Sequence, residues 1–345
     1  MRVAFFTYPS AFQNIGGGEI LMLQLKKALS EKDVDVRFFD IWNDQLEAFD
    51  LLHVFSCQSE CLGLVRMASS SGIPVVVHPI AFETWDSVWH GVDPKIRFSS
   101  LTRFMVKKLC PNFPSDRRSL LKLADQLFPN SIAEAEYLAR HFGVRRDKMF
   151  VVPNGVDAAV ESASPEPFQR ETGIREEFIL CSGRIEPRKN QKNFIQAANR
   201  LNIKAVVLGD PVKGYESYYE ECKHLAAGNI KFIPALSHES GALYSAYAAS
   251  RVVVLPAFVE TPGLVGLEAG ILGRPLSVTT GGPTKEYYAE NACYLNPSSV
   301  NSIQGSVESA LKQSSNPGLR HRIKQHYTWD KVAARLIEGY ERALK

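Results

Sequence analysis

The sequence predicts an α/β protein with two doubly wound domains, each built on its own parallel sheet. The first observation is that short apolar runs alternate with segments of helical periodicity along the chain. The second is the length of 345 residues, which favours two domains over one. The third is a stretch at residues 157–167, whose Ala, Ser, Pro and Glu content is typical of a linker between domains.

In the first half, short runs rich in Val, Leu and Phe predict buried strands, and the periodic segments between them predict helices. We expect strands at residues 3–6, 34–39, 51–55, 75–78, 126–129 and 149–152, and helices at residues 20–29 and 62–69. Because the strands alternate with helices, crossover connections make this sheet parallel.

The second half has the same architecture but no detectable sequence repeat. We expect strands at residues 178–182, 205–208, 230–232, 251–255 and 276–278, and helices at residues 190–201, 217–226, 239–248, 264–272 and 330–344. The expected domains are residues 1–160 and 161–328, followed by a terminal helix within residues 329–345.

The composition is that of an ordinary water-soluble globular protein, with 45% hydrophobic and 22% charged residues. The net charge of +3 is too small to indicate a nucleic-acid partner. The six cysteines form no Cys-x-x-Cys pair, which argues against a zinc or redox site and favours reduced thiols in the cytoplasm. The chain opens directly into an expected strand, so we expect no signal peptide, and no apolar run approaches the ~20 residues of a membrane span.

Residues 252–284 carry the strongest functional signal. Glu260 lies in the loop after an apolar strand, and Glu268 lies about one turn into the next helix. Ligands of open α/β sheets bind at the carboxyl ends of strands, where a helix N-terminus presents free N–H groups to an anion. Neighbouring glycines allow the backbone to come close to such a ligand. The alternative is that Glu260 caps the helix and Glu268 is a solvated helix residue.

This stretch resembles the family 4, or group 1, glycosyltransferases of the GT-B fold. Their signature pairs two Glu residues at this spacing, and the typed positions that agree are Pro256, Glu260, Gly263, Leu264, Leu267, Glu268 and Ala269. The resemblance implies two Rossmann-like domains facing a cleft, with a C-terminal helix that crosses back to the N-terminal domain. It also implies a retaining hexosyltransferase that uses a nucleotide-diphosphate sugar, with the acceptor side on the first domain.

Two motifs of the first half fit this resemblance. Gly17 and Gly18 lie between the first strand and helix, where the family binds the donor diphosphate, although a flexible turn would explain them equally well. His78 ends an apolar strand, and a neutral imidazole there can hydrogen-bond sugar hydroxyls. The alternative for His78 is a structural role, and Pro79 departs from the residue that often follows in the family.

Arg184 and Lys189 follow the first strand of the second half, in the Gly-Arg-x₄-Lys register of the family. Fixed cations at this place stabilise the charge that grows on a diphosphate leaving group, without a metal. A solvated basic loop is the alternative, and Arg188 is a possible further contact. The Asp-Val-Asp sequence at residues 33–35 lies at the start of a strand, so we expect no metal site.

The resemblance implies a role for each site residue. Glu268 would bind the nucleotide ribose, and Glu260 would hold hydroxyls of the donor sugar. Backbone N–H groups near Gly263 and Leu264 would hold the diphosphate, with fewer amides than usual because Pro262 has no N–H. The expected catalytic residues are Glu260, His78, Arg184 and Lys189, and the expected donor-binding residues are Gly17, Gly18, Arg184, Lys189, Gly263, Leu264 and Glu268.

The segment of residues 97–122 interleaves basic residues with Phe, Leu and Met side chains. Such a pattern is typical of a membrane-surface helix or of a site for an anionic acceptor, and an ordinary basic face is the alternative. We therefore expect a saccharide or lipid-linked acceptor and peripheral association with the inner membrane face. Two other functions remain open, namely a nucleotide-sugar epimerase or hydrolase of the same fold and a non-catalytic nucleotide-sugar-binding subunit.

Overall fold

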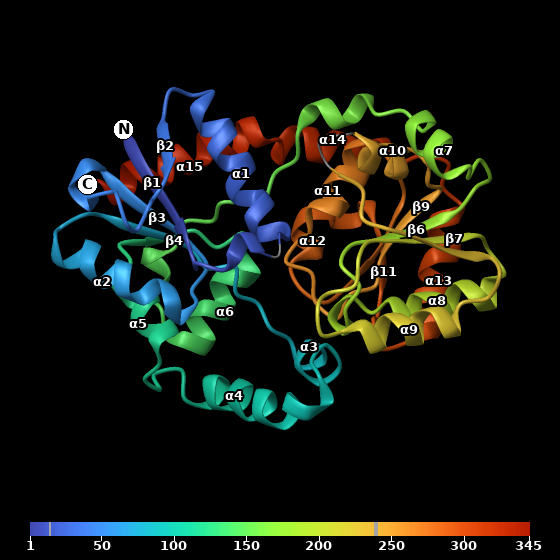
Figure 1. The fold of residues 1–345 in the computed structure, drawn as a ribbon, viewed down its shortest axis with the longest axis horizontal. Coiled ribbons are helices and arrows are strands. Elements are labelled where there is room, and N and C mark those ends of the chain that lie inside the picture. Colours follow the sequence, from blue (N-terminus) through green and yellow to red (C-terminus); the bar gives the residue numbers. More distant parts are fainter. Residues whose placement is uncertain (14, 238–240) are drawn as a thin grey trace. The chain divides into compact units, whose positions relative to one another are not determined.

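The computed structural model describes residues 1–13, 15–237 and 241–345. The chain forms two compact units, coloured along the sequence in Figure 1. Unit 1 comprises Met1–Phe82, Arg103–Gly155 and Tyr327–Lys345, and unit 2 comprises Glu83–Thr102 and Val156–His326. The boundaries expected at residues 160 and 328 stay predictions.

Unit 1 is built on a parallel sheet with the strand order β2-β1-β3-β4-β5. Its strands are β1 (Arg2–Thr7), β2 (Asp35–Phe38), β3 (Leu51–Phe55), β4 (Val75–His78) and β5 (Gln126–Leu127). Its helices are α1 (Gly17–Ser30), α2 (Leu62–Ser70), α5 (Asp116–Leu123), α6 (Ile132–Phe142) and α15 (Trp329–Ala343). All residues of β3 and β4 are buried, as expected for apolar strands covered by helices on both faces.

The C-terminal helix α15 belongs to unit 1 and packs against α1, β4 and β5. Its buried residues recur at helical spacing, which gives it one apolar face. Gly339 lets α15 lie close to Phe128, because a Cβ at this position would come within 2.8 Å of the Phe128 ring. This face brings Tyr340, which is fully buried, against the centre of the sheet.

The structure has no regular strand at residues 149–152, so this prediction was wrong. Only an isolated bridge joins Met149 to Leu127, although the Phe150 and Val152 N–H groups donate to Leu127 and Pro129 carbonyls at 2.9 Å. Pro129 has no N–H to donate in return, so a regular ladder cannot continue there.

Unit 2 is built on a parallel sheet with the strand order β11-β10-β9-β6-β7-β8. Its strands are β6 (Ile179–Ser182), β7 (Ala205–Leu208), β8 (Ile230–Ile233), β9 (Val252–Leu255), β10 (Leu276–Thr279) and β11 (Cys293–Leu295). Its helices are α3 (Trp85–His90), α7 (Glu166–Thr172), α8 (Gln191–Leu201), α9 (Glu216–Leu225), α10 (Ala242–Ala249), α11 (Leu264–Ile271), α12 (Thr284–Tyr288), α13 (Val300–Leu311) and α14 (Pro317–His326). The sequence did not predict β11, and of the helix expected at residues 239–248, positions 239 and 240 lie outside the described residues.

The linker expected at residues 157–167 is not an extended connection. It contains a 3₁₀ helix at Ala158–Ser162 and the start of α7, and both belong to unit 2. The Asp157 side chain accepts a hydrogen bond from the Ala159 N–H, which begins the 3₁₀ turn.

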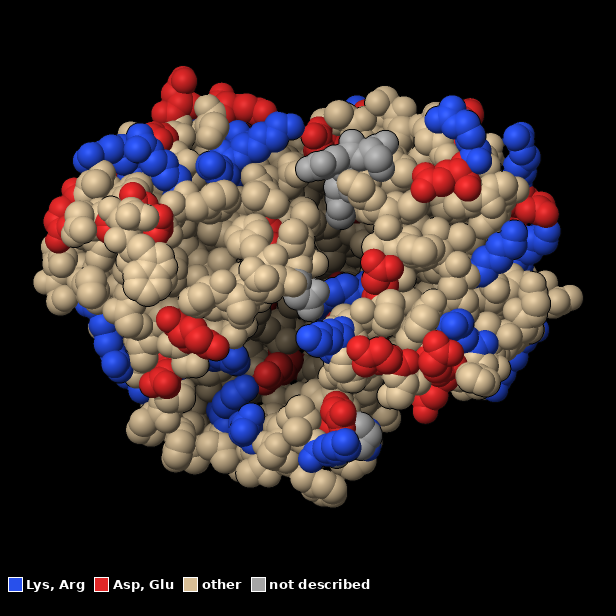
Figure 2. Space-filling view, in the orientation of Figure 1, with Lys and Arg blue, Asp and Glu red and all other residues tan. Residues whose placement is uncertain are grey.

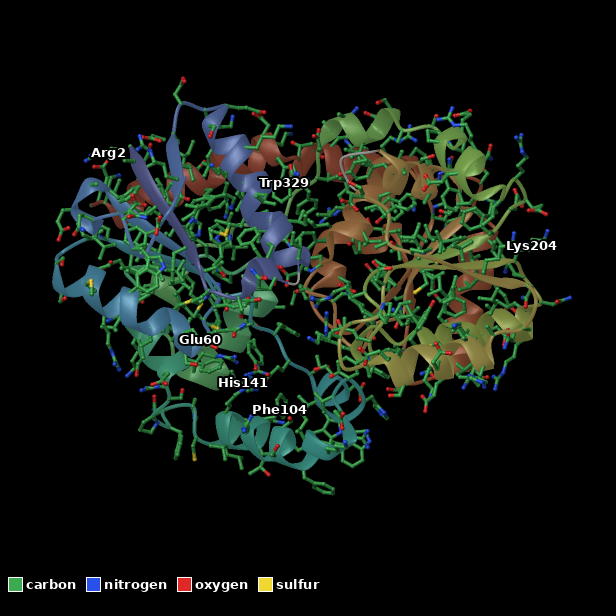
Figure 3. All side chains as sticks on the ribbon, in the orientation of Figure 1. Arg2, Glu60, Phe104, His141, Lys204 and Trp329 are labelled. Atoms are coloured by element: carbon green, nitrogen blue, oxygen red, sulfur yellow. The ribbon has the colours of Figure 1, made fainter. Side chains whose placement is uncertain are left out.

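The basic segment forms two helices, α4 (Arg97–Leu109) and α5, rather than one continuous element. Phe98 and Leu109 are 78% and 71% exposed, whereas Leu101 and Phe104 are buried. Figure 3 shows Phe104 facing His141 of α6, with ring centroids 5.8 Å apart. Part of the apolar pattern in α4 therefore serves ordinary packing.

The predicted α/β class, with two Rossmann-like parallel sheets, is confirmed. On the surface drawn in Figure 2, basic side chains are interspersed with acidic ones on both units. No helix in the described part of the chain is long and apolar enough to cross a bilayer.

Candidate functional site

The carboxyl edge of the unit 2 sheet brings together two residues that are 71 positions apart. Lys189 lies in the loop after β6, and Glu260 lies in the loop after β9. Because β6 and β9 are neighbouring parallel strands, these two loops meet. The Lys189 Nζ lies 2.5 Å from the Glu260 Oε1, and their side chains are only 20% and 5% exposed. The alternative that Lys189 belongs to a solvated loop is therefore wrong.

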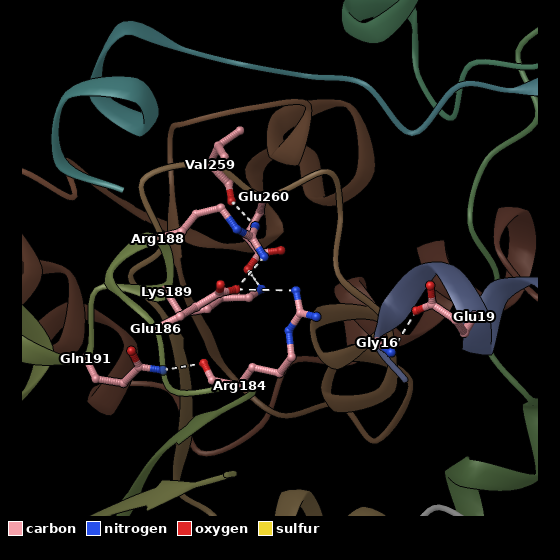
Figure 4. A network of polar contacts seen from close by, with 9 residues as sticks. All are labelled: Gly16, Glu19, Arg184, Glu186, Arg188, Lys189, Gln191, Val259 and Glu260. Atoms are coloured by element: carbon pink, nitrogen blue, oxygen red, sulfur yellow. Dashed lines mark hydrogen bonds and ion pairs between the residues drawn. The ribbon is translucent and has the colours of Figure 1, made fainter. Parts of the chain in front are cut away.

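Arg184 and Arg188 extend this charged cluster, which Figure 4 shows at close range. Arg188 and Arg184 place Nη2 atoms 2.9 Å and 3.4 Å from one Oε1 of Glu186. The Arg184 side chain remains 39% exposed, so part of its guanidinium fork faces solvent. The cluster combines three cations with two carboxylates, and an anion that entered it would meet hydrogen-bond donors already in position.

Close backbone approaches fix the Glu260 loop. The backbone N–H of Glu260 donates to the Gly281 carbonyl at 2.9 Å. Gly282 has a φ of 105°, and a Cβ there would come within 2.1 Å of the Glu260 carbonyl oxygen. A Cβ at Gly263 would lie 2.8 Å from the Glu260 Oε2. Gly282 therefore tolerates no side chain without a backbone shift, and Gly263 lies in close contact with the carboxylate at the start of α11.

Gly263 is the N-cap of α11, and Leu264 is its first helical residue. The first N–H groups of a helix have no partner within that helix, so this backbone is suited to an anion. The Glu260 carboxylate makes its short contact with Lys189, and α11 has no side-chain cap hydrogen bond. The alternative that Glu260 caps this helix is therefore wrong.

Glu268 lies inside α11 and is 5% exposed, so the alternative of a solvated helix residue is also wrong. It makes a hydrogen bond with Tyr247, whose hydroxyl lies 3.4 Å from the Ser182 hydroxyl at the end of β6. Burial raises the pKa of the Glu268 carboxyl to about 7, and the Tyr247 hydrogen bond partly opposes that shift. Burial therefore moves the pKa of this carboxyl toward neutral pH.

In unit 1, the glycine loop at the start of α1 is held by its own acidic residue. The Gly16 N–H donates to the Glu19 Oε2 at 2.8 Å (Figure 4), and the Tyr8 hydroxyl donates to the Glu19 Oε1 at 3.2 Å. The Gly16–Glu19 contact is part of a capping box at the start of α1. A Cβ at Gly17 would meet no atom within 4 Å, whereas a Cβ at Gly18 would contact Ile80 at 3.5 Å.

His78 ends β4 and is 2% exposed. Its Nδ1 lies 2.7 Å from the Nε2 of His53, and the Nδ1 of His53 lies 2.6 Å from the Tyr340 hydroxyl. The Nε2 of His78 has no hydrogen-bond partner among the described residues. Burial lowers the pKa of His78 to about 3 and that of His53 well below its usual value, so both rings are neutral at pH 7.

The backbone around His78 is strained at two non-glycine residues. Ser56, just after β3, has a φ of 106°, and the β-branched Ile80 has a φ of 49°. Both values lie in a region that such side chains rarely adopt, and strain of this kind clusters at functional sites. The loop after His78 is anchored by Glu134, whose two carboxylate oxygens accept the Ala81 N–H at 2.6 Å and the Asn130 N–H at 2.7 Å.

The sequence predictions missed His53, Tyr340 and Glu134. A signal for His53 existed, because it interrupts the apolar run of a buried strand, and buried polar groups have hydrogen-bond partners. Glu134 carries a weaker signal, a serine three residues before it that begins a helix. Tyr340 fits the apolar face of its helix, and nothing in the pattern distinguishes it from a core residue.

A cavity of about 580 Å³ lies in unit 2 beside the charged cluster. His90 of α3 lines it and stacks on Phe258, with ring centroids 5.0 Å apart. The Thr84 hydroxyl donates to the Phe258 carbonyl at 3.5 Å. Residues before α4 therefore support the loop that carries Glu260.

No group of three or more His, Cys, Asp or Glu side chains in the described ranges is placed to hold a metal ion. Asp33 and Asp35 lie at the amino end of β2, as expected, away from the carboxyl edge of the sheet.

Comparisons with known proteins agree in both halves of the chain. The family model for glycosyl transferases group 1 matches residues 165–327, and the model for glycosyltransferase family 4 matches residues 42–160. The chain is 27% identical over 244 residues to a D-inositol 3-phosphate glycosyltransferase of Paenarthrobacter aurescens, and 31% identical over 172 residues to one of Geodermatophilus obscurus. These matches cover 64% and 44% of this chain but only 58% and 37% of the relatives.

Solved structures share the fold over nearly the whole chain. A sucrose-phosphate synthase from Thermosynechococcus elongatus has a TM-score of 0.77 and 16% identity, with 99% of both chains covered. The Anabaena protein HepE in complex with UDP-glucose has a TM-score of 0.73 and 17% identity, again with 99% of both chains covered. With family models matching both halves, the chain belongs to the group 1, family 4 glycosyltransferases.

Proposed function

We propose that this member of the group 1 glycosyltransferases transfers a sugar from a nucleotide-diphosphate donor to a hydroxyl of a saccharide or lipid-linked acceptor. The observation that carries the proposal is the 2.5 Å ion pair between Lys189 and Glu260, with Arg184 beside it, at the carboxyl edge of unit 2. A nucleotide sugar has an anionic diphosphate next to a neutral, hydroxyl-rich ring. The cluster offers cations for the first and a carboxylate for the second.

In the transfer, the bond between the anomeric carbon and the diphosphate oxygen breaks, and its electron pair stays on the diphosphate. The acceptor hydroxyl oxygen bonds the anomeric carbon, and its proton passes to the diphosphate. Negative charge therefore grows on the leaving group in the transition state. Arg184 and Lys189 are fixed donors at that place, and such preorganised groups are often the largest single contribution to catalysis.

Glu260 has a distinct role in this scheme. In the free protein the Glu260 carboxylate pairs with the Lys189 ammonium. This pairing offsets part of the desolvation penalty of placing both charges in a loop with little solvent exposure. When the diphosphate takes over the Lys189 ammonium, the Glu260 oxygens are released to accept hydrogen bonds from sugar hydroxyls. Glu268, inside α11, would bind the nucleotide ribose, as the resemblance to the family implies.

The likeness to HepE, whose structure holds UDP-glucose, favours a uridine nucleotide as the first donor to test. A thermal-shift screen with UDP, GDP, ADP and their glucose conjugates measures binding to the folded state. We expect the conjugate of one base to raise the melting temperature of the wild type and not of Glu260→Gln combined with Lys189→Ala. If none of the ligands shifts the wild type, the donor site is not where we place it.

A product assay separates the remaining alternatives. A transferase forms a new glycoside only when acceptor is present, whereas an epimerase or hydrolase converts the donor alone. A non-catalytic binding subunit would show a thermal shift with no turnover in either assay. We further propose retention of anomeric configuration, which NMR of the glycoside product tests directly.

We also propose that transfer needs no divalent metal, because Arg184 and Lys189 supply the positive charge at the diphosphate. Turnover should therefore be unchanged after dialysis against EDTA. Loss of activity with EDTA and recovery with Mg²⁺ or Mn²⁺ would contradict this part of the proposal.

The exposed apolar and basic side chains of α4 support peripheral binding to an anionic membrane. Phe98 and Leu109 are exposed, and each basic residue near such a surface contributes about 1 kcal/mol. Replacing Arg103, Lys107 and Lys108 with Glu should weaken sedimentation with phosphatidylserine vesicles and leave donor binding unchanged. Wild-type sedimentation of this triple variant would show that α4 is an ordinary solvated face.

A further inference from the structure

Three polar side chains from distant parts of the sequence form a hydrogen-bonded chain inside unit 1. Tyr340 of α15 contacts the Nδ1 of His53 on β3, and the Nε2 of His53 contacts the Nδ1 of His78 on β4. The two imidazole planes are 25° apart with centroids at 4.8 Å. His53 and Tyr340 are fully buried, so solvent does not compete for these bonds.

The hydrogen bonds that link Tyr340, His53 and His78 have one favoured donor-to-acceptor direction. A neutral imidazole has one N–H donor and one acceptor nitrogen, so each contact fixes the next. Burial raises the pKa of Tyr340 well above its usual value, so its O–H is present. If that O–H donates to the Nδ1 of His53, the Nε2–H of His53 donates to the Nδ1 of His78. The opposite direction would leave the buried Tyr340 O–H without a partner among the described residues.

With this direction, the remaining proton of His78 lies on Nε2. That nitrogen is buried and has no partner among the described residues. It lies at the carboxyl end of β4, where the strained residues Ser56 and Ile80 flank it in sequence and in the sheet. A buried donor without a partner, beside stored backbone strain, is the arrangement expected of a site that a ligand completes.

We propose that Tyr340 and His53 are positioning residues that hold His78 as its Nε2–H tautomer, which donates a hydrogen bond to a hydroxyl or ring oxygen of the saccharide substrate. The proposal rests on the proposed function for the identity of that oxygen. The tautomer belongs to the free protein and can be measured without any reaction. The terminal helix thus acts on the predicted site through a side chain that does not itself touch substrate.

Long-range ¹H–¹⁵N correlation spectra of the full chain, labelled with ¹⁵N-histidine, report the tautomer of each ring. His78→Gln identifies the His78 signals by their loss. We expect His78 to be a neutral Nε2–H ring from pH 5 to pH 8, because burial keeps its pKa near 3. A wild-type His78 that carries its proton on Nδ1, or that is charged in this range, overturns the proposal.

Three variants test the hydrogen-bonded series Tyr340–His53–His78, which we call the relay. Tyr340→Phe removes only the hydroxyl, and we expect the ratio of Nε2–H to Nδ1–H at His78 to fall by about fivefold or more, since one hydrogen bond no longer biases it. His53→Leu should have the same effect, whereas His53→Gln retains an amide N–H for the Nδ1 of His78 and should preserve the tautomer. Tyr137→Phe is the matched control, a buried tyrosine of unit 1 outside the relay. An unchanged tautomer in both Tyr340→Phe and His53→Leu overturns the proposal.

Kinetics then separate this inference from the proposed function. Tyr340→Phe should lower kcat/KM for sugar transfer by about fivefold, with His53→Gln closer to wild type than His53→Leu, while thermal unfolding confirms that each variant is folded. If the tautomer is as expected but the protein transfers no sugar, the proposed function is wrong and the relay stands. If sugar is transferred and Tyr340→Phe changes the tautomer but not kcat/KM, the assigned effect on substrate is wrong.

Discussion

In unit 2, the carboxyl edge of the sheet carries charged side chains in partly exposed loops, whereas in unit 1 the corresponding edge carries a neutral imidazole on a buried hydrogen-bonded chain. The Arg184 and Lys189 side chains are 39% and 20% exposed, and His78 is 2% exposed. Two sheets with the same architecture therefore support different chemistry. The fold sets where a site can form, and the loop residues set which charge it holds.

The difference follows from how each edge is held. Unit 2 holds its loops with ion pairs and with glycines in contact with backbone, which leaves cationic ends for an incoming anion. Unit 1 holds the carboxyl edge of its sheet with the neutral imidazoles of His53 and His78 and with Glu134. Both Glu134 side-chain oxygens accept hydrogen bonds from backbone N–H groups. We infer that charge stabilisation belongs to unit 2 and orientation by neutral hydrogen bonds to unit 1.

The sharpest test of this comparison is Lys189→Ala. Because the cation is placed where charge develops, we expect turnover at saturating donor to fall by about 10²–10³. Tyr340→Phe in unit 1 should cost far less. Lys204→Ala is the matched control, since that lysine is 54% exposed and pairs with Glu176 on the surface.

Lys189→Ala also leaves the Glu260 carboxylate without its cation. In the double variant Lys189→Ala with Glu260→Gln no buried charge is uncompensated, so urea unfolding of the single and double variants measures the stability cost of the unpaired carboxylate, apart from turnover. If Lys189→Ala retains near-wild-type turnover, unit 2 does not stabilise the leaving group in the way we infer.

A pH series compares the two buried glutamates. Burial raises the pKa of the Glu268 carboxyl to about 7, above its value near 4.5 in the unfolded chain. The stabilising contribution is therefore fully present below pH 4.5 and is lost as the pH rises to about 7. We expect the stability of Glu268→Gln relative to wild type to increase by about 3 kcal/mol between pH 4.5 and pH 8, as urea unfolding would measure.

Glu134 provides the contrast, although burial raises the pKa of its carboxyl to about 7 as well. Both of its oxygens accept backbone N–H groups, and the amide of Gln offers only one acceptor. Glu134→Gln should therefore destabilise the protein by about 1–3 kcal/mol even at pH 4.5. Equal stability changes for Glu134→Gln and Glu268→Gln at pH 4.5 would remove the distinction that we draw between these two buried glutamates.

An effect of similar size to that of Glu134→Gln concerns the backbone of the Glu260 loop. Gly282→Ala adds a Cβ that would lie 2.1 Å from the Glu260 carbonyl oxygen, at a φ of 105°. We expect a loss of about 1–3 kcal/mol in stability, measured by urea unfolding, together with weaker donor binding. Gly305→Ala in α13 is the control, because nothing lies within 4 Å of a Cβ there. A Gly282→Ala variant as stable as wild type would show that this loop adapts.

Much of the fold followed from local pattern. Apolar runs such as residues 51–55 and 75–78 agree with β3 and β4, because a buried parallel strand must be apolar on both faces. Residues 149–152 do not form a strand because the neighbouring segment of the same chain has Pro129 where a ladder donor is needed. The strand β11 was missed because the sequence Cys-Tyr-Leu is too short to show a period.

The sequence by itself indicated that Lys189 and Glu260 each follow a strand of one parallel sheet, whose carboxyl ends share an edge, and the structure showed that β6 and β9 are neighbours in that sheet. It also predicted that Glu268 belongs to that region, but not that burial would raise its pKa. Only the tertiary structure decided the relay from Tyr340 through His53 to His78. Those side chains are 287 and 25 positions apart, and hydrogen-bond partners across such separations depend on how helices pack on a sheet. Periodicity records only which face of each element is buried, so it cannot specify which buried polar atoms meet.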